Sequence, residues 1–546
     1  MNMEIKNKII SKQLISSINF YDHYETFLLG SSNDDRTEFF GICGEQHYRL
    51  LAYLSSSVDN ATIIDIGTHR GQSALALSYN PTNIVHTFDI ECRVTNDGIK
   101  NASNIKFHMD NLFDTNGREK WKETILQSSF IFLDVDPHNG TMEIDMYRYL
   151  ENIGYNGFVI CDDIWQFKDM RDNFWYQIPY CRRYDLTELG HHSGTGIFTF
   201  NEKIKFKILD DTNEPLGNND YDNKNSDWTL VTAYFNLTKC KDASHEIKNR
   251  DFGYYMSHSM STLSVPYNLV VHCDQESYGI IKNLRPAYLA EKTSYVIRDF
   301  DSMVIKGKTV ANLREIVIKN RLHRPYEFDN RNTASYYLFC MTRYAMMMEV
   351  INTNIFKSTH FCWINFCIER MGISNVYRLD ESLSLHRDKF STCYIDYIPY
   401  ELIKDTHEYF RYGRCSMCSG FFTGNTKYMY EVCNLIQDKF IEFLNDGYGH
   451  ADEQLYSPVY FENSHLFEQY FGDYRQMITN YKQINENSNA PYLNFVKNSF
   501  HYGNYKMCAK ACTFLLQSHN NKKCHYEDTI LQDIHKIHNE CKKRLQ

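Results

Sequence analysis

Short apolar runs alternate with helical patterns through the first two hundred residues. The apolar runs predict strands at Ala61–Ile66, Asn83–Phe88, Ile105–His108, Phe130–Leu133 and Phe158–Cys161, with helices at Gly71–Tyr79, Trp121–Gln127 and Thr141–Asn152 between them. Alternation at this spacing predicts βαβ units and a parallel sheet. Because the runs are apolar throughout, we expect both faces of that sheet to be buried.

A second unit of the same character begins near residue 228, and a helical segment follows it. Its expected strands are Trp228–Tyr234, Tyr267–His272, Ser294–Ile297 and Phe361–Phe366, and Ser335–Val350 has a long helical pattern. Three further helical patterns lie at Tyr492–Phe500, Tyr505–Gln517 and Tyr526–Arg544. Polar stretches at Asn201–Asp227 and Gln483–Ala490 indicate boundaries. The chain is therefore expected to be α/β, with domains at 1–220 and 221–485 and a helical segment at 486–546.

Composition narrows the functional classes. The 546 residues exceed the roughly 250–300 at which single cores stop growing. The formal net charge of −10 argues against a general nucleic-acid binder, which needs clustered cations. No apolar run approaches the ~18 residues of a membrane helix, and the first residues lack a signal-peptide pattern. The 17 scattered cysteines favour reduced thiols. We expect a cytoplasmic location, or the host cytoplasm for a viral protein.

Acidic residues and glycines stand where the first strands end. Asp65 is followed by Gly67 and Gly71 at positions i+2 and i+6, which lets a ligand approach the backbone closely at the start of a helix. A negative side chain at this turn argues against a pyrophosphate and suits an amino-bearing ligand; an ordinary βα turn is the alternative. Asp89 ends the second strand, where a carboxylate can accept ribose hydroxyls, and Asp110 follows the third, near the expected place of an adenine.

Three more carboxylates follow the fourth and fifth strands. Asp134 ends the run FIFLD, and Asp162 and Asp163 end FVICDD. The carboxyl ends of parallel strands share one edge of a sheet, so these side chains should converge. Carboxylates that converge repel one another unless a cation bridges them. Metal binding is the favoured interpretation, and separate solvated loop acids are the alternative.

This set of motifs resembles the class I S-adenosylmethionine-dependent methyltransferases over about Phe39–Phe200. More narrowly, it is similar to the small-molecule O-methyltransferases of the Methyltransf_24 and cephalosporin-hydroxylase-like type. The segment Leu133–His138, the acid Asp145, Gly157 before Asp162 and Asp163, and the closing Gly194–Phe198 match that pattern. The resemblance implies a Rossmann-like doubly wound domain.

The resemblance also implies roles for individual residues. S-adenosyl-L-methionine would be bound by Asp65, Gly67, Thr68, Gly71, Asp89 and Asp110. A divalent ion, Mg²⁺ or Mn²⁺, would be bound by Asp134, Asp162 and Asp163. The metal would lower the pKa of a hydroxyl and hold it in line with the methyl group. His138 is the candidate base, and a structural role for this histidine stays open.

The second unit carries motifs whose order is informative. They are the segment Val231–Phe235, FCWINFC at 361–367, SGFFTG at 419–424, Asp452-Glu453-Gln454, and Phe471–Tyr474 with Asn480-Tyr481. This order resembles the WlaTC/HtrL (YibB-like) family, regarded as glycosyltransferases of GT-A type, over about Trp228–Tyr481. The resemblance implies a GT-A-like α/β domain that uses a nucleotide sugar.

Site residues in the second unit follow from this resemblance. The nucleotide sugar would contact Ala233, Tyr234, Asp274 and Asn365, with Tyr234 stacking on the base. Asp452 or Glu453 would take the proton of the acceptor. Asn365 stands where the family has an aspartate, and an amide is a weaker ligand for a divalent ion than a carboxylate. Lys427 or Arg414 would then carry the charge of the diphosphate.

The resulting hypothesis is a bifunctional glycan-modifying enzyme. One domain would methylate a sugar hydroxyl and the other would transfer a sugar from a nucleotide-sugar donor to a glycan acceptor. The alternative is an active methyltransferase with a second domain that binds a glycan or nucleotide without turnover. A nucleic-acid methyltransferase would need a basic cleft and a polar motif such as NPPY, and the sequence has neither.

Overall fold

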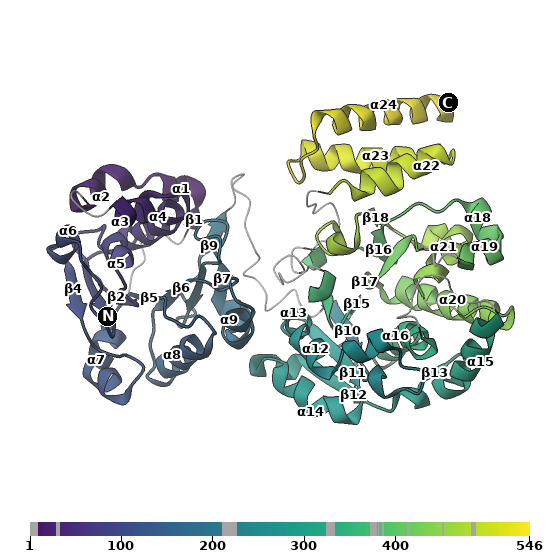
Figure 1. Ribbon diagram of the computed structural model, residues 1–546, viewed down its shortest axis with the longest axis horizontal. Coiled ribbons are helices and arrows are strands. Elements are labelled where there is room, and N and C mark those ends of the chain that lie inside the picture. Colours follow the sequence, from purple (N-terminus) through teal and green to yellow (C-terminus); the bar gives the residue numbers. More distant parts are fainter. Residues whose placement is uncertain are drawn as a thin grey trace. The chain divides into compact units, whose positions relative to one another are not determined.

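The computed structural model divides into two compact units, residues 1–221 and 222–546 (Figure 1). It describes residues 9–28, 33–209, 227–323, 333–371, 379, 382–384, 387–411, 415–449, 452–481 and 488–546. The α/β class predicted from the sequence is confirmed: each unit contains a mixed sheet with parallel strands at its centre and helices around it. None of the described helices combines the length and apolar character that a membrane crossing requires.

The described strands of the first unit form a seven-stranded sheet. Its order is β4 (Ile105–His108), β3 (Ile84–Phe88), β2 (Thr62–Ile66), β5 (Phe130–Leu133), β6 (Phe158–Cys161), β8 (Gly196–Thr199) and β7 (Arg183–Asp185). The first five are parallel, and β8 runs antiparallel to both of its neighbours. Strand order reverses between β2 and β5, which is the switch point where doubly wound sheets bind ligands.

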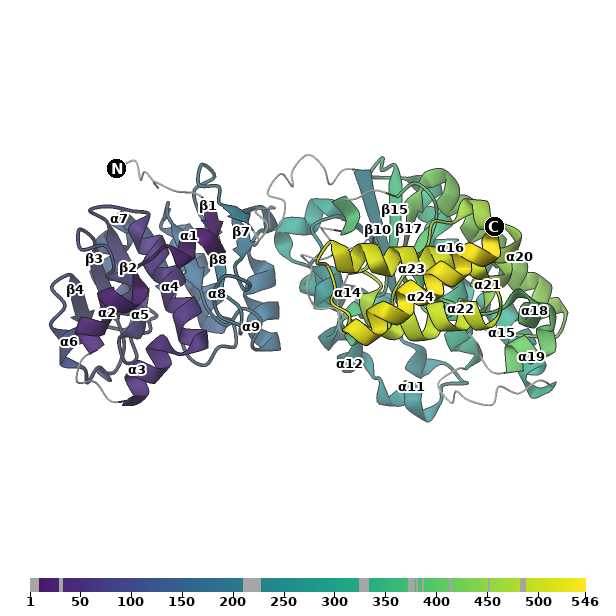
Figure 2. The same ribbon diagram turned by 90° about the horizontal axis from the view of Figure 1, so that it is seen from above.

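Helices cover both faces of this sheet (Figure 2), which explains why its strands are apolar throughout. They are α1 (Lys12–Ser16), α2 (Phe20–Leu28), α3 (Asn33–Phe40), α4 (Ile42–Ser56), α5 (Gln72–Leu77), α6 (Asp97–Lys100), α7 (Thr115–Gln127), α8 (Thr141–Asn152) and α9 (Lys168–Asn173). Ile63 of β2, Phe132 of β5 and Ile160 of β6 are fully buried in the core. A short parallel pair, β1 (Ile9–Ser11) and β9 (Lys207–Leu209), lies outside the main sheet.

The second unit contains another seven-stranded sheet built from its described residues. Its order is β12 (Thr293–Ile297), β11 (Asn268–Cys273), β10 (Trp228–Tyr234), β15 (His360–Ile364), β17 (Met417–Asn425), β16 (Ser391–Tyr394) and β18 (Tyr470–Phe471). The four strands from β12 to β15 are parallel, and β17 is antiparallel to β15 and β16. Strand order reverses between β10 and β15, so the carboxyl ends of these two strands form a second switch point.

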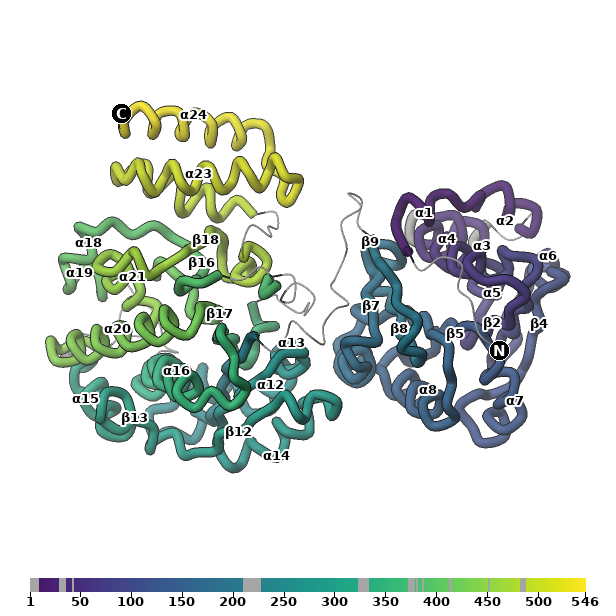
Figure 3. Tube along the Cα trace, turned by 180° about the vertical axis from the view of Figure 1, so that it is seen from behind, coloured from purple at the N-terminus to yellow at the C-terminus, as the bar shows by residue number. Residues whose placement is uncertain are grey.

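Helices surround the second sheet (Figure 3), with a small hairpin of β13 (Val304–Ile305) and β14 (Lys308–Thr309). They are α11 (His245–Asn249), α12 (Phe252–Ser257), α13 (Met260–Leu263), α14 (Gln275–Leu284), α15 (Val310–His323), α16 (Ala334–Thr353), α18 (Tyr400–Lys404), α19 (Thr406–Arg411), α20 (Thr426–Asn445) and α21 (Glu453–Glu462). Short 3₁₀ turns include η7 (Ile368–Met371) and η9 (Tyr474–Gln476).

The C-terminal helices belong to the second unit. They are a π-helical segment, η11 (Pro491–Lys497), then α22 (Asn498–His501), α23 (Tyr505–Asn520) and α24 (Asp528–Leu545). The ring of Phe495 packs 4.6 Å from Phe471 of β18 and 4.7 Å from Tyr394 of β16, between ring centroids. This contact attaches the helices to the edge of the sheet. The bounds of these helices agree closely with the three helical patterns predicted from the sequence.

Candidate functional site

The switch point of the first unit is built around Asp65, which lies in β2. The side chain is fully buried, and its Oδ2 accepts hydrogen bonds from the hydroxyls of Thr87 (2.5 Å) and Ser73 (3.2 Å). The other oxygen, Oδ1, is buried without a hydrogen-bond partner among the described residues. Burial raises the pKa of Asp65 to about 7, although the two hydroxyls oppose the shift. A buried acceptor without a donor is costly, so this oxygen is suited to a ligand that donates.

The glycine loop brings the end of β2 close to the end of β5. Gly67 has a φ of +102°, and a Cβ there would lie 1.7 Å from the carbonyl oxygen of Asp134. Gly71 has a φ of +89° and forms the N-cap of α5. The Thr68 hydroxyl lies 2.5 Å from that of Thr87. The glycines are therefore required by close approach and by the left-handed backbone.

Asp89 and Asp110 follow β3 and β4, as expected, but their surroundings differ. Asp89 accepts the backbone N–H of His69 (2.8 Å) and of Glu91 (3.2 Å), one on each oxygen. Each oxygen keeps a lone pair for another donor. Asp110 is held by Lys120 (2.7 Å) and by the Trp121 indole N–H (3.0 Å) of α7, and these contacts lower its pKa.

The structure brings Asp134, Asp162 and Asp163 together with two histidines. Nδ1 of His138 lies 3.8 Å from Asp134 and 3.4 Å from Asp163. Nδ1 of His191 lies 3.4 Å from Asp162. Two groups could each hold a metal ion, Asp134 with His138 and Asp163, and Asp162 with Asp163 and His191, and they share Asp163.

Charges within this cluster shift the pKa values of its members. Burial and the neighbouring carboxylates Asp162 and Asp163 raise the pKa of Asp134 well above its usual range. Burial acts to raise the pKa of Asp162, but His47 and His191 outweigh it and the net shift is downward. The hydrogen bond to Asp162 raises the pKa of His191. His47 and His191 therefore favour the ionised form of Asp162, whereas burial lowers the pKa of His47 itself.

Three residues of this site were not identified from the sequence: His191, His47 and Glu143. His47 of α4 is buried 3.7 Å from Asp162. Glu143 of α8 is fully buried, neither of its carboxyl oxygens makes a hydrogen bond of normal geometry within the described part of the chain, and burial raises its pKa. The sequence offered one signal, the pair His191-His192 just before the closing strand. Glu143 lies within the helix expected at Thr141–Asn152, His47 lies in a segment for which no element was predicted, and neither belongs to a motif.

Three of the eight described non-glycine residues with a positive φ lie at this site. His69, His138 and Asp163 have φ values of +44°, +49° and +60°. Residues other than glycine rarely adopt this left-handed conformation, and such outliers cluster at functional sites. One of the three lies in the glycine loop and two lie in the cluster of histidines and aspartates.

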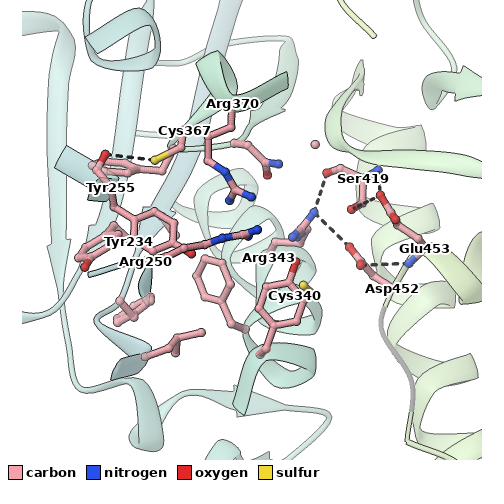
Figure 4. Close-up of a pocket in the computed structure, with 18 of the residues that line it drawn as sticks. Tyr234, Arg250, Tyr255, Cys340, Arg343, Cys367, Arg370, Ser419, Asp452 and Glu453 are labelled. Atoms are coloured by element: carbon pink, nitrogen blue, oxygen red, sulfur yellow. Dashed lines mark hydrogen bonds and ion pairs between the residues drawn. The ribbon is translucent and has the colours of Figure 1, made fainter. Parts of the chain in front are cut away.

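The second unit contains a cavity of about 550 Å³ at the carboxyl ends of β10 and β15 (Figure 4). Ala233 and Tyr234 of β10 line it, as do Asn365, just after β15, and Asp452 and Glu453 at the start of α21. Motifs that are far apart in the sequence therefore meet in one place. Asp274 is not among the lining residues: its side chain caps α14 and accepts hydrogen bonds from the N–H groups of Asn236 (3.0 Å) and Ser277 (2.8 Å).

The two acids of the Asp-Glu-Gln motif have different environments. Asp452 is buried and lies 3.2 Å from the guanidinium of Arg343, which also donates to the Ser419 carbonyl (2.6 Å). Glu453 is half-buried and accepts the Ser419 N–H and hydroxyl (both 3.1 Å) and the Tyr474 hydroxyl (2.8 Å). Burial raises the pKa of both acids, and for Glu453 the nearby Asp452 adds to the shift.

Asn365 and Tyr234 lie on the wall of the cavity formed by the sheet. The Asn365 side-chain oxygen accepts the Trp363 indole N–H (3.1 Å). The Tyr234 ring packs 5.3 Å from Phe366 and 5.4 Å from Tyr255. This part of the cavity is therefore aromatic.

Arginines that the sequence did not indicate line the same cavity. Arg250 follows α11 and Arg370 lies in η7. Lys427 is exposed in α20 and does not line the cavity, and Arg414 lies outside the described residues. Arg250 and Arg370 belong to no recognised motif, so only the fold shows that they line the cavity.

Comparisons with known proteins match the two units separately. Residues 226–482 match the family described as "Bacterial protein of unknown function (HtrL_YibB)", which supports the HtrL/YibB part of the resemblance noted for the second unit. No curated protein matches the chain.

Among solved structures, similar chains include a candidate caffeoyl-CoA O-methyltransferase from Staphylococcus aureus (14% identity, TM-score 0.22, 33% of this chain and 98% of that one). An SAH-bound methyltransferase from Podospora anserina has 15% identity and a TM-score of 0.19, over 27% of this chain and 62% of that one. Mouse xyloside xylosyltransferase 1, in its apo form, has 12% identity and a TM-score of 0.25, over 44% of this chain and 84% of that one.

Proposed function

We propose that the first unit is an S-adenosylmethionine-dependent O-methyltransferase that acts on a sugar hydroxyl. The observation that carries this proposal is Asp65, a buried carboxylate with one unpartnered oxygen, at the switch point of a doubly wound sheet. Its neighbour across the switch point, Asp134, belongs to a cluster of carboxylates and histidines that suits a divalent ion. The resemblance of the motifs to class I methyltransferases supports the same interpretation.

The residues present fit this cofactor. Oδ1 of Asp65 is placed to accept a hydrogen bond from an amino group, and the remaining lone pairs of Asp89 suit ribose hydroxyls. Gly67 and Gly71 keep the loop free of side chains where the ligand would approach. When bound, S-adenosylmethionine supplies an electrophilic methyl group. The task of the protein is then to orient the acceptor and to take its proton.

The cluster also fits a divalent ion. Each of its two groups offers two carboxylates and one imidazole. Carboxylates alone suit Mg²⁺, whereas an added imidazole favours a first-row transition ion, so of the two ions expected we favour Mn²⁺. When bound, the ion supplies positive charge that lowers the pKa of a coordinated hydroxyl.

If Asp162, Asp163 and His191 hold the ion, the ring of His138 is left to move the proton of the acceptor. It is about one-fifth exposed, between Asp134, Asp136 and Asp163. The ring of Phe167 stacks beside it, with centroids 6.2 Å apart, and is 46% exposed. An exposed flat ring next to a base gives a sugar a surface to pack on, which supports a glycan acceptor.

A reciprocal ligand test checks the first unit. Thermal unfolding of the full chain is followed with S-adenosylhomocysteine or with MnCl₂, for wild type and for Asp65→Asn and Asp163→Asn. A ligand at ~100 times its dissociation constant adds ~2.7 kcal/mol to the unit that it binds. We expect Asp65→Asn to lose the response to S-adenosylhomocysteine and keep that to Mn²⁺, and Asp163→Asn to do the reverse. If neither ligand stabilises the wild type, the methyltransferase proposal fails.

The pH dependence of Asp65 gives the same test a second readout. Its folded pKa of about 7 exceeds the ordinary 3.8, so between these values the folded state holds a proton that the unfolded state releases. This group therefore makes the free energy of unfolding fall as pH rises through that window. A donating ligand favours the ionised form, so S-adenosylhomocysteine should bind more tightly at pH 8 than at pH 6. An affinity that does not change with pH would contradict this role.

For the second unit we propose glycosyl transfer from a nucleotide sugar to a glycan. The proposal rests on the cavity, in which an aromatic wall at Tyr234 and Tyr255 and the carboxylate of Glu453 line the same space. We assign the acceptor base to Glu453, because Asp452 is buried against Arg343. The raised pKa of Glu453 moves it toward the range in which a base acts well near neutral pH.

Asn365 favours the second candidate function, a domain that binds its ligand without turnover, because its amide oxygen already accepts the Trp363 N–H.

Purified full-length protein is incubated with radiolabelled nucleotide sugars, and release or transfer of sugar is measured. For an active enzyme, Glu453→Gln should lower the rate by about 10²–10⁴-fold, the usual contribution of general-base catalysis. Binding with no donor cleavage by the wild type would favour the non-catalytic alternative.

A further inference from the structure

Arg250 and Arg370 converge in the cavity of the second unit. Figure 4 shows both side chains reaching into the same space, with Arg343 opposite. No ion pair joins Arg250 or Arg370 to a carboxylate in the described part of the chain, and the Arg370 guanidinium lies 5.7 Å from the centre of the Tyr254 ring. Two guanidinium groups that face one another without a counter-charge repel, and an anion between them would remove that repulsion.

The acids of the cavity do not supply this counter-charge. Asp452 is paired with Arg343, and Glu453 accepts hydrogen bonds from Ser419 and Tyr474. Glu246 also lines the cavity, but no ion pair joins it to either arginine in the described part of the chain. The anion must therefore come from a ligand.

The same cavity is poorly equipped for a metal ion. Both groups of described residues that could hold one belong to the first unit. Asn365 offers an amide oxygen that is already engaged with Trp363, and an amide is a weaker ligand for a divalent ion than a carboxylate. A diphosphate that enters this cavity therefore has guanidinium groups available to neutralise it, and no carboxylate cage.

We propose that Arg250 and Arg370 bind the diphosphate of a nucleoside diphosphate-linked sugar, and that this binding needs no divalent ion. Guanidinium groups form paired, charge-assisted hydrogen bonds with phosphate oxygens. The aromatic rings of Tyr234 and Tyr255 lie beside the arginines and would contact the base of the nucleotide. Glu453 lies on the opposite side of the cavity, where the sugar would be bound.

The proposed site accounts for every charge in the transfer. The bond between the sugar carbon and the diphosphate oxygen breaks, and that carbon bonds to the acceptor oxygen. The acceptor proton passes to Glu453. The diphosphate leaves with the electron pair, and its added negative charge is held by Arg250 and Arg370. This inference rests on the proposed function of the second unit, but it makes a separate claim about how the anion is bound.

Calorimetric binding of UDP, GDP, ADP, CDP and inorganic pyrophosphate to the full chain tests the claim, in EDTA and in MnCl₂. We expect at least one nucleoside diphosphate to bind equally well in both. Arg250→Gln and Arg370→Gln should each weaken binding by about tenfold or more, the usual effect of losing a charge-assisted hydrogen bond. Lys427→Gln, an exposed cation outside the cavity, should leave binding unchanged.

A second variant tests the reason for metal independence. Asn365→Asp restores a carboxylate at the end of β15, so MnCl₂ should strengthen nucleoside diphosphate binding in this variant and not in the wild type. Binding that requires Mn²⁺ in the wild type, or that survives the double Arg250→Gln/Arg370→Gln change in a folded protein, overturns the inference. So does an absence of binding by every probe, or binding of pyrophosphate alone.

Failure of the proposed function has a different signature. If a nucleoside diphosphate binds in EDTA and depends on both arginines, but no nucleotide sugar is cleaved, then the anion site stands and glycosyl transfer fails.

Discussion

Replacing Arg343 with methionine is expected to lower the free energy of unfolding of the second unit by about 3–5 kcal/mol. Arg343 is buried in α16, where its guanidinium lies 3.2 Å from Asp452 and 5.3 Å from the centre of the Trp363 ring. Methionine keeps most of the apolar volume but removes the charge. Asp452 would then be a buried carboxylate that accepts hydrogen bonds from the Tyr344 hydroxyl (3.0 Å) and the Glu453 N–H (3.0 Å) but has no counter-charge. An uncompensated buried charge is the costly outcome of breaking such a pair.

The pH dependence distinguishes this explanation from a simple loss of packing. Burial already raises the pKa of Asp452, and Arg343 opposes that shift. Without Arg343 the pKa rises further, so the folded state holds a proton over a wider range and its stability falls as pH rises. The loss relative to wild type should therefore be larger at pH 8 than at pH 5.

Hydrogen exchange of peptides from α16 and α20, in the full chain, measures this loss for the second unit. The double variant Arg343→Met/Asp452→Asn should recover much of the stability, because it removes both charges. If Arg343→Met lowers the free energy of unfolding by less than about 1 kcal/mol at pH 8, the size expected for an exposed pair, then the Arg343–Asp452 pair does not stabilise the second unit.

Gly67→Ala is expected to destabilise the first unit by about 3 kcal/mol or more, in the range of the large single-residue effects. Two costs add: a φ of +102°, which alanine avoids, and a Cβ that would lie 1.7 Å from the Asp134 carbonyl oxygen. The obstructing atom belongs to the backbone, so relief requires that the ends of β2 and β5 move apart. Binding of S-adenosylhomocysteine should be lost with the local geometry.

Gly154→Ala is the matched control for this variant. Gly154 has a φ of +73°, and nothing lies within 4 Å of the place of its Cβ. Its cost should be about 1–2 kcal/mol, that of the left-handed backbone alone. Denaturant unfolding with hydrogen exchange of peptides from β2 and α8 compares the two. Equal losses of unfolding free energy in the two variants would mean that the close approach of Gly67 to the Asp134 carbonyl adds nothing to the cost.

The structure explains which parts of the site could be predicted. Asp65, Asp134, Asp162 and Asp163 were found because each ends a strand, and parallel strands place their carboxyl ends on one edge. His47 could not be found in this way, since it lies within a helix and reaches Asp162 only through packing. Asp274 follows a strand in the same manner, yet its side chain caps α14, so a position at a strand end does not by itself place a residue in a site.

The sequence by itself determined the α/β class, most strand positions and the acids at the strand ends. These features are local: an apolar run of a given length and the residue that ends it are visible in a few consecutive positions. Only the tertiary structure decided which of these residues share a site and which charges compensate one another. The pairing of Arg343 with Asp452, and the convergence of Arg250 with Arg370, join residues more than a hundred positions apart. Such contacts depend on how helices pack around the sheet, which local hydrophobic patterns do not specify.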